Sequence, residues 1–154
     1  MLDVTLKLVK TTVSTIMKYR LMDILACPYD KTFPLVLIVL EEKEYPERKY
    51  EWEKKPFCEE YCGYLRKSIK EIGDKAPCEE CIKKEIVTGI LYCPSCGRWY
   101  PIKEEIPILL PDELRSQKED LEFLQSVKEN LEKVAPDLAP KILNEGKPFC
   151  LKQS

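Results

Sequence analysis

The chain has 154 residues, enough to bury one hydrophobic core but too few for two ordinary domains. Its formal net charge of -2 argues against a general nucleic-acid binder, and the absence of histidine excludes histidine-dependent catalysis. The charged content of 34%, with few Asn and Gln residues, is typical of thermophilic proteins. No apolar run is long enough to cross a bilayer, so we expect a soluble, cytoplasmic protein.

The first segment, residues 1–16, is expected to be an extension of the folded domain, although it can also be read as an N-terminal strand. It contains an acidic residue and polar threonines and lacks a small-residue cleavage site, so it matches a signal peptide poorly. After it, "FPLVLIVL" at 33–40 is short, apolar and β-branched, which predicts a buried strand. The charges and Pro46 within 41–55 then predict a solvated loop.

Two helices are predicted next. In "FCEEYCGYLRKSIKEIG" at 57–73, the cysteine, leucine and isoleucine residues recur at helical spacing, and Gly73 stands where a helix would end. A second short helix is predicted to follow Pro77 and to end near Gly89. Residues 41–87 are therefore expected to be a helical insertion that is rich in cysteine.

The remaining elements surround a second turn. "ILYC" and "RWYPI" predict two short strands that flank the turn "CPSCG" at 93–97. "EEIPILLPDEL" predicts an apolar, strand-like segment closed by Pro111. Apolar residues then recur every three or four positions from Leu121 to Val134, which predicts an amphipathic helix that ends before Pro136. We favour packing of this stripe on the domain over a dedicated partner surface.

The turn "CPSCG" carries half of a metal site, because a tight reversal can present the thiolates of Cys93 and Cys96 to one tetrahedral ion. Three motifs could supply the other half: "CPYD", "CEEYC" and "CEEC". Spacing favours "CEEC", since eleven residues separate Cys81 from Cys93, as in an ordinary zinc ribbon. A helix followed by a strand between these two pairs would, however, point them apart.

The turn "CPYD" has no such difficulty, because strands from distant parts of a chain can pair and the loop between them closes at a slowly growing entropic cost. The predicted site is then Cys27, Asp30, Cys93 and Cys96. A carboxylate is an accepted zinc ligand, but it is a harder ligand than a thiolate. The site with Asp30 is therefore expected to bind zinc less tightly than a site of four thiolates. Alternatively, Asp30 caps a turn that has lost its metal. A rubredoxin-like iron site would require a fourth thiolate.

A second group of four cysteines lies in the predicted insertion. It is expected to form either a second zinc site, which we favour slightly, or two disulfides, and its members are Cys58, Cys62, Cys78 and Cys81. Cys150 is expected to be an unpaired thiol. A redox enzyme is a weaker alternative, because neither CxxC pair opens a helix after a strand of a βαβ unit.

Two stretches together, "MKYRLMDILACPYDKTFPL" and "GILYCPSCGRWYPIKEEIPILLPDELR", resemble the methyltransferase-activator family, the small zinc-binding subunits of tRNA, rRNA and release-factor methyltransferases. The resemblance covers Met17 to about Leu40 and Thr88 to Arg115. It implies an α+β fold in which both turns form one zinc-knuckle domain, with Asp30 in place of a cysteine. A second departure is Glu105, which replaces a glycine usual in the family.

The resemblance, together with the segments outside it, gives the expected domain organisation. We expect an N-terminal extension at residues 1–16 and a zinc-knuckle β domain made of two separate segments, 17–40 and 88–115. A helical, cysteine-rich insertion is expected at 41–87, and a C-terminal helical extension at 116–154. The insertion and the helix after Arg115 lie outside the resemblance, so it implies nothing about their roles.

The function implied by the resemblance is that of a non-catalytic subunit that binds, stabilises and activates a class I methyltransferase as a heterodimer. The glycines of this chain assemble no nucleotide-binding loop, so S-adenosylmethionine would belong to the partner. The residues expected to contact the partner form an apolar run: Ile106, Pro107, Ile108, Leu109 and Leu110. Side chains alternate along a strand, so five apolar residues in succession cannot all face inward. The alternative is that this run is entirely core.

A rival interpretation from another class is a zinc-ribbon module that binds nucleic acid or acts in transcription. An exposed basic and aromatic face around Arg98, Trp99 and Tyr100 would favour it.

Overall fold

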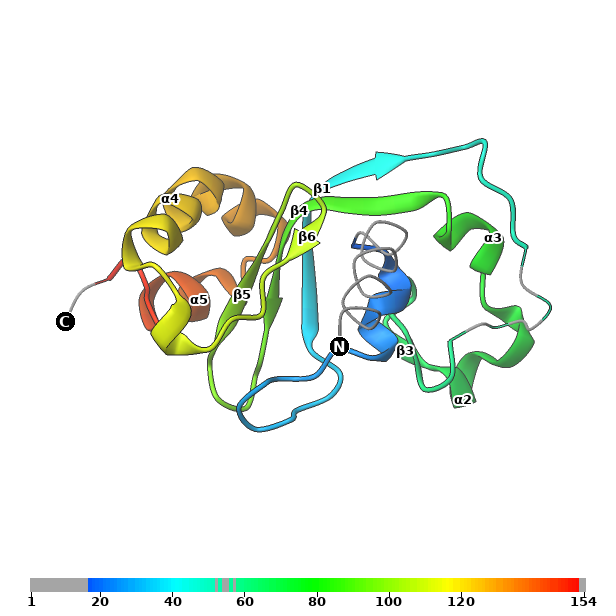
Figure 1. The fold of residues 1–154 in the computed structure, drawn as a ribbon, viewed down its shortest axis with the longest axis horizontal. Coiled ribbons are helices and arrows are strands. Elements are labelled where there is room, and N and C mark those ends of the chain that lie inside the picture. Colours follow the sequence, from blue (N-terminus) through cyan, green and yellow to red (C-terminus); the bar gives the residue numbers. More distant parts are fainter. Residues whose placement is uncertain (1–16, 52, 54–55, 57, 153–154) are drawn as a thin grey trace, which may run out of the picture.

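The structure is a computed structural model that describes residues 17–51, 53, 56 and 58–152. Its centre is a four-stranded antiparallel sheet with the strand order β1-β4-β5-β6 (Figure 1). The strands are β1 (Val36–Glu44), β4 (Lys84–Tyr92), β5 (Trp99–Lys103) and β6 (Ile106–Pro107). Strands and helices together give the expected α+β fold, and the two strands predicted on either side of "CPSCG" are confirmed as the ends of β4 and β5.

The pairing of β1 with β4 joins parts of the chain that are far apart in sequence, with Val36 opposite Tyr92 and Glu44 opposite Lys84. These two strands continue beyond the rest of the sheet and carry the insertion at their far end (Figure 1). The loop predicted for 41–55 is therefore wrong for its first four residues, and the predicted boundaries at 40 and 88 fall inside paired strands. Each strand satisfies the other's backbone groups, so charged side chains are tolerated there.

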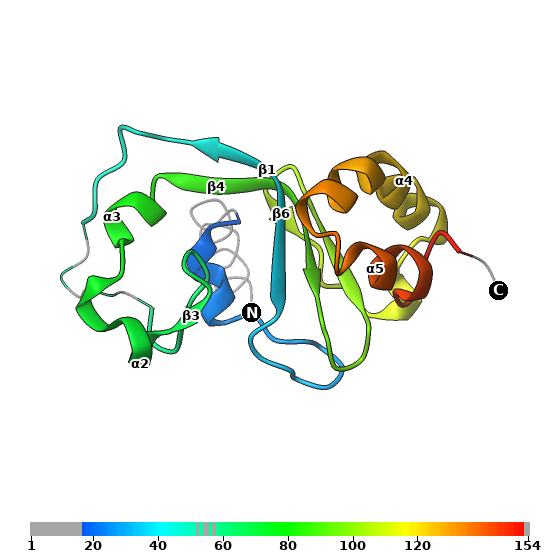
Figure 2. The ribbon, with the colours of Figure 1, turned by 180° about the vertical axis from the view of Figure 1, so that it is seen from behind.

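Two helices, α4 (Gln117–Val134) and α5 (Ala139–Glu145), cover one face of the sheet (Figure 2). Ser116 caps the start of helix α4, because its hydroxyl accepts the N–H of Glu119, and the helix ends before Pro136 as predicted. The predicted stripe does pack on the domain, because Leu124, Val127 and Leu131 are buried, whereas Val134 is 49% exposed. The core on this face consists of Ile38, Ile90, Tyr92, Trp99, Phe123, Leu124, Val127, Leu131, Ala139, Ile142 and Leu143.

The other face of the sheet is covered by the 3-10 helix η1 (Tyr19–Asp23) and its flanking residues. This second core consists of Met17, Tyr19, Met22, Cys27, Leu35, Leu37, Cys81, Ile86, Leu91, Cys93, Tyr100 and Ile102. Neighbouring residues such as Leu37 and Ile38 enter different cores, as the alternation of side chains along a strand requires. The sheet is thus the middle layer of the molecule.

The insertion differs from its prediction. It contains the hairpin strands β2 (Tyr61–Cys62) and β3 (Lys67–Ser68), then α2 (Ile69–Ile72), the 3-10 turn η2 (Gly73–Lys75) and α3 (Cys78–Cys81). The helix predicted over 57–73 is therefore wrong before Ile69, where the chain reverses through Arg66 at a φ of 58°. The second predicted helix is only one turn long, because the chain becomes strand β4 at Lys84 and not after Gly89.

The expectations for residues 1–16 lie outside the described residues. Within the described part, no helix combines the length and apolar character needed to cross a membrane.

Candidate functional site

Two turns of matching geometry, which begin at Cys27 and Cys93, lie side by side. In each turn the carbonyl oxygen of the cysteine accepts the N–H of the residue four positions on, Lys31 or Gly97, at 2.9 Å. The N–H of each cysteine donates back to the carbonyl oxygen five positions on, at 3.0 and 2.8 Å. Lys31 and Gly97 adopt positive φ values of 60° and 81°. We call this arrangement a knuckle turn.

The two knuckle turns bring together all four ligands predicted for the metal site. The ligand atoms of Cys27, Asp30, Cys93 and Cys96 lie within 4.8 Å of one another, and no other group of three or more candidate ligands among the described residues is gathered in this way. The Sγ atoms of Cys27 and Cys96 are 3.6 Å apart, and Oδ1 of Asp30 is 3.5 Å from Sγ of Cys93. Two thiolates on one tetrahedral zinc ion lie about 3.8 Å apart, so these donors fit a single ion of that kind.

Asp30 occupies the position of the expected second cysteine and caps its own turn. Its Oδ1 accepts the N–H of Thr32 at 3.1 Å, which closes the turn as a capping aspartate does. Hydrogen bonds from Thr32 also hold the pKa of Asp30 well below its usual range. The carboxylate is therefore ionised at neutral pH and lies beside the thiol of Cys93, within a group that could hold a metal ion.

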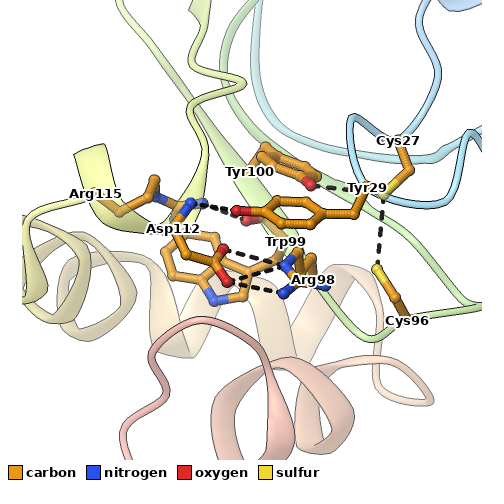
Figure 3. Close-up of polar contacts among 8 residues, drawn as sticks. All are labelled: Cys27, Tyr29, Cys96, Arg98, Trp99, Tyr100, Asp112 and Arg115. Carbon is orange, nitrogen blue, oxygen red and sulfur yellow. Dashed lines mark hydrogen bonds and ion pairs between the residues drawn. The ribbon is translucent and has the colours of Figure 1, made fainter.

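Tyr100 completes the surroundings of Cys27. Its Oη lies 3.6 Å from the sulfur of Cys27 (Figure 3). Burial, followed by the hydrogen bond and charge of Cys27, raises the pKa of Tyr100, so the hydroxyl keeps its proton and can donate it to the sulfur. Sequence reasoning missed this role, because Tyr100 and Cys27 are distant in sequence. The predicted strand after "CPSCG" was the one signal that placed Tyr100 near the turn.

Arg98 brings positive charge to the same region. Its Nη2 and Nε donate to the Asp112 carboxylate at 2.8 and 3.1 Å, and its guanidinium lies over the ring of Tyr29 (Figure 3). Asp112 first, and Cys96 after it, raise the pKa of Arg98. A permanent cation beside Cys96 offsets part of the negative charge that three thiolates and a carboxylate would gather.

The exposed aromatic face required by the nucleic-acid interpretation is not found at this turn. Trp99 and Tyr100 are fully buried. The indole of Trp99 stacks on Phe123 and donates to the carbonyl oxygen of Phe149 at 2.8 Å. Arg98 is paired with Asp112, so this turn offers no free basic and aromatic surface.

The apolar run 106–110 lies at the edge of the sheet, where β6 is the outermost strand. None of its five residues is buried, which rules out the alternative that the run is entirely core. Ile106 is 50% exposed and Leu110 is 38% exposed, whereas Leu109 packs partly against the core. The expectation that some of these side chains face outward is confirmed, and their contact with a partner remains a prediction.

The second group of cysteines lies in the insertion. Its four members, Cys58, Cys62, Cys78 and Cys81, are all buried. Burial raises the pKa of Cys58 to about 12 and also raises the pKa of Cys81. These two thiols therefore lack the low pKa and exposure that a redox enzyme needs. Cys150 stands apart from both groups, beside the carbonyl oxygens of Asn144 and Lys152.

Comparison with known proteins connects this geometry to a family. The family model for the Trm112p-like protein matches residues 18–105, which is more than half of the chain and includes both knuckle turns. The chain belongs to the Trm112p-like family. This confirms the resemblance to methyltransferase-activator subunits and supports a general role of that kind for the present Trm112p-like protein. A search of curated proteins finds no match.

The family match has a clear limit. It ends at Glu105, so the run 106–110 and the helices α4 and α5 lie beyond it. The exposure of that run is a property of this chain and has to be explained from its own contacts.

Proposed function

We propose that this protein is a non-catalytic subunit that binds, stabilises and activates an S-adenosylmethionine-dependent methyltransferase of class I that acts on tRNA, rRNA or a translation release factor. The observation that carries the proposal is the apolar run 106–110, which stays outside the core at the edge of the sheet. The family match supports the general role.

The edge strand β6 provides a natural place for a partner. An edge strand offers backbone groups that pair with another strand, and an exposed apolar patch beside it favours association. Ile106 and Leu110 present apolar side chains at this edge, and the neighbouring Leu114 is exposed as well. A partner strand laid along β6 would cover them. The resulting assembly is a heterodimer.

Zinc is the metal that we assign to the knuckle site. Cys27, Cys93, Cys96 and Asp30 would hold it, and a zinc ion with four protein ligands stabilises a fold and leaves no open position for a substrate. In a small domain, the site exists only in the folded state, so the free energy of zinc binding stabilises the fold. In this chain the ion would join the turn before β1 to the turn between β4 and β5. The metal would therefore hold these parts of the sheet together and take no part in catalysis.

Activation would follow from mass action. A subunit that binds only the folded methyltransferase shifts the folding equilibrium of the methyltransferase toward the folded state. The shift grows with the ratio of the free subunit concentration to the dissociation constant of the complex. Covering an apolar face of the partner also keeps it from aggregating. The cofactor and substrate sites would both belong to the partner.

The test is a double substitution, Ile106→Asp with Leu110→Asp, in a tagged protein expressed in its native cells. Both side chains are exposed, so the free energy of unfolding should change by only about 0.5 kcal/mol per site. We expect a methyltransferase to co-purify with the unaltered protein and to be lost from the variant. The control is Val134→Asp, which changes an exposed apolar residue on α4. Retention of the methyltransferase by the double variant would contradict the proposed interface.

A further inference from the structure

The insertion contains a third knuckle turn, which begins at Cys62. The carbonyl oxygen of Cys62 accepts the N–H of Arg66, four positions on, at 2.7 Å, and Arg66 has a φ of 58°. Cys62 is paired with Lys67, five positions on, in the β2-β3 hairpin. The N–H of Leu65 donates to the Cys62 sulfur at 3.4 Å. Such hydrogen bonds orient a thiolate ligand and stabilise its charge.

This turn differs from the other two at its fourth position. Leu65 stands where Asp30 and Cys96 stand in the other turns, and its exposed side chain cannot bind a metal. The third turn therefore offers one ligand, Cys62, and any metal site built on it needs ligands from neighbouring segments.

Neighbouring segments do offer such ligands. Cys58 lies just before β2, and Cys78 and Cys81 lie in α3. Residues three apart in a helix share a face, so α3 presents both of its thiols in one direction. A hairpin cysteine and a pair on one helical turn are the parts from which structural zinc sites are commonly assembled.

Between residues 58 and 81 of the insertion, cysteine is the main residue type that is buried. From residue 58 to residue 81, six residues are buried: Cys58, Cys62, Gly63, Ala76, Cys78 and Cys81. The larger apolar side chains that recur at helical spacing in this segment, Leu65, Ile69 and Ile72, are not buried. A segment of this size without an apolar core needs a cross-link or a metal to hold its shape.

The sulfur atoms of the four insertion cysteines are not gathered as tightly as the ligand atoms of the knuckle site, so metal binding would require them to approach further.

Contacts with η1 and the residues around it hold the β2-β3 hairpin in place. The carboxylate of Asp23 accepts the N–H groups of Glu59, Glu60 and Tyr61 at 2.7 to 2.9 Å, so it is already occupied. A Cβ atom at Gly63 would lie 2.4 Å from the carbonyl oxygen of Tyr19, which shows how closely the turn packs on η1. Both contacts fix Cys58 and Cys62 relative to the core.

We propose that Cys58, Cys62, Cys78 and Cys81 bind a second metal ion, a zinc ion held by four thiolates, separate from the knuckle site. This ion replaces an apolar core and fixes the insertion to the far end of β1 and β4. Each thiol loses its proton to solvent when the metal binds, so binding strengthens as the pH rises through neutrality. The inference is independent of the proposed function, since it concerns how this chain holds its own fold.

The deciding measurement is the zinc content of the unaltered protein, purified under reducing conditions and analysed by mass spectrometry of the metal. We expect about two zinc ions per chain. Cys58→Ser with Cys78→Ser should retain about one, and the control Cys150→Ser should retain two. One zinc ion in the unaltered protein, together with an intact mass that lacks the hydrogens of four thiols, would show two disulfides and overturn the proposal.

A second measurement covers the case in which the double variant does not fold. The unaltered protein with its metal is treated with an alkylating reagent before and after addition of a chelator, and the labelled cysteines are identified. The four insertion cysteines should be protected before chelation and labelled after it. Equal labelling under both conditions, or one zinc ion per chain with all four thiols reduced, would also overturn the proposal.

Discussion

Single residues around the knuckle site hold its ligands in place. The hydroxyl of Tyr100 lies 3.6 Å from the sulfur of Cys27, and the N–H of Thr32 donates to the carboxylate of Asp30. Neighbours of this kind orient metal ligands and raise the affinity for the ion. The four candidate ligands could be found from sequence motifs. The contact of Tyr100 with Cys27 could not, because contacts between residues 73 positions apart depend on the completed fold.

Cys93→Ser should destabilise the protein far more than Cys150→Ser. Cys93 is fully buried and belongs to the ligand group, whereas Cys150 is partly exposed near the C-terminus. Loss of a metal ligand should lower the free energy of unfolding by at least about 3 kcal/mol, and the change at Cys150 should cost about 0.5 kcal/mol. Urea denaturation of both variants measures this, and similar values would show that Cys93 is not a ligand.

Two Arg–Asp pairs of different burial allow a matched comparison. Arg115 and Asp120 are almost fully buried, with their side chains 1% and 6% exposed, and Arg115 also donates to the carbonyl oxygen of Trp99. Asp120→Ala would leave a buried guanidinium unpaired, at a cost of about 3–5 kcal/mol. Asp112→Ala removes the more exposed partner of Arg98 and should cost about 1 kcal/mol or less. Thermal unfolding of the two variants gives the comparison, and equal costs would mean that burial does not decide the strength of these pairs.

At the scale of elements, helix α4 was predictable and the insertion was not. The stripe of α4 is long and strongly periodic, and Pro136 marks its end, whereas the cap at Ser116 was found only in the structure. In the insertion, the four-residue spacing of Cys58 and Cys62 imitated a helix, and the reversal uses Arg66, which carries no turn signal. The charged half of β1 was missed for a similar reason, since its pairing with β4 overrides its composition.

Leu131→Ala tests how strongly α4 is anchored to the sheet. Leu131 is fully buried among residues of the sheet and both helices, so truncation should cost about 2–5 kcal/mol. Val134→Ala, three residues later on the same helix, removes an exposed side chain and should cost less than about 0.5 kcal/mol. Chemical denaturation measures both values. A small loss at Leu131 would mean that α4 covers the sheet without stabilising it.

At the scale of the whole molecule, the sheet is covered on both faces and carries exposed apolar side chains at its β6 edge. The helices α4 and α5 cover one face, and η1 with its flanking segments covers the other (Figures 1 and 2). The side chains left outside the core at the β6 edge, Ile106 and Leu110, are then available to a partner. The layer arrangement could not be derived from the sequence, because it depends on a C-terminal pair of helices outside the family pattern.

The most direct test is methyl transfer from labelled S-adenosylmethionine to the substrate of the methyltransferase that co-purifies with this protein. The purified methyltransferase should be weakly active alone and strongly activated by the unaltered protein. Ile106→Asp with Leu110→Asp should abolish the activation, and the Trm112p-like protein alone should transfer no methyl groups. Equal activation by the double variant, or methyl transfer by the chain alone, would contradict the account.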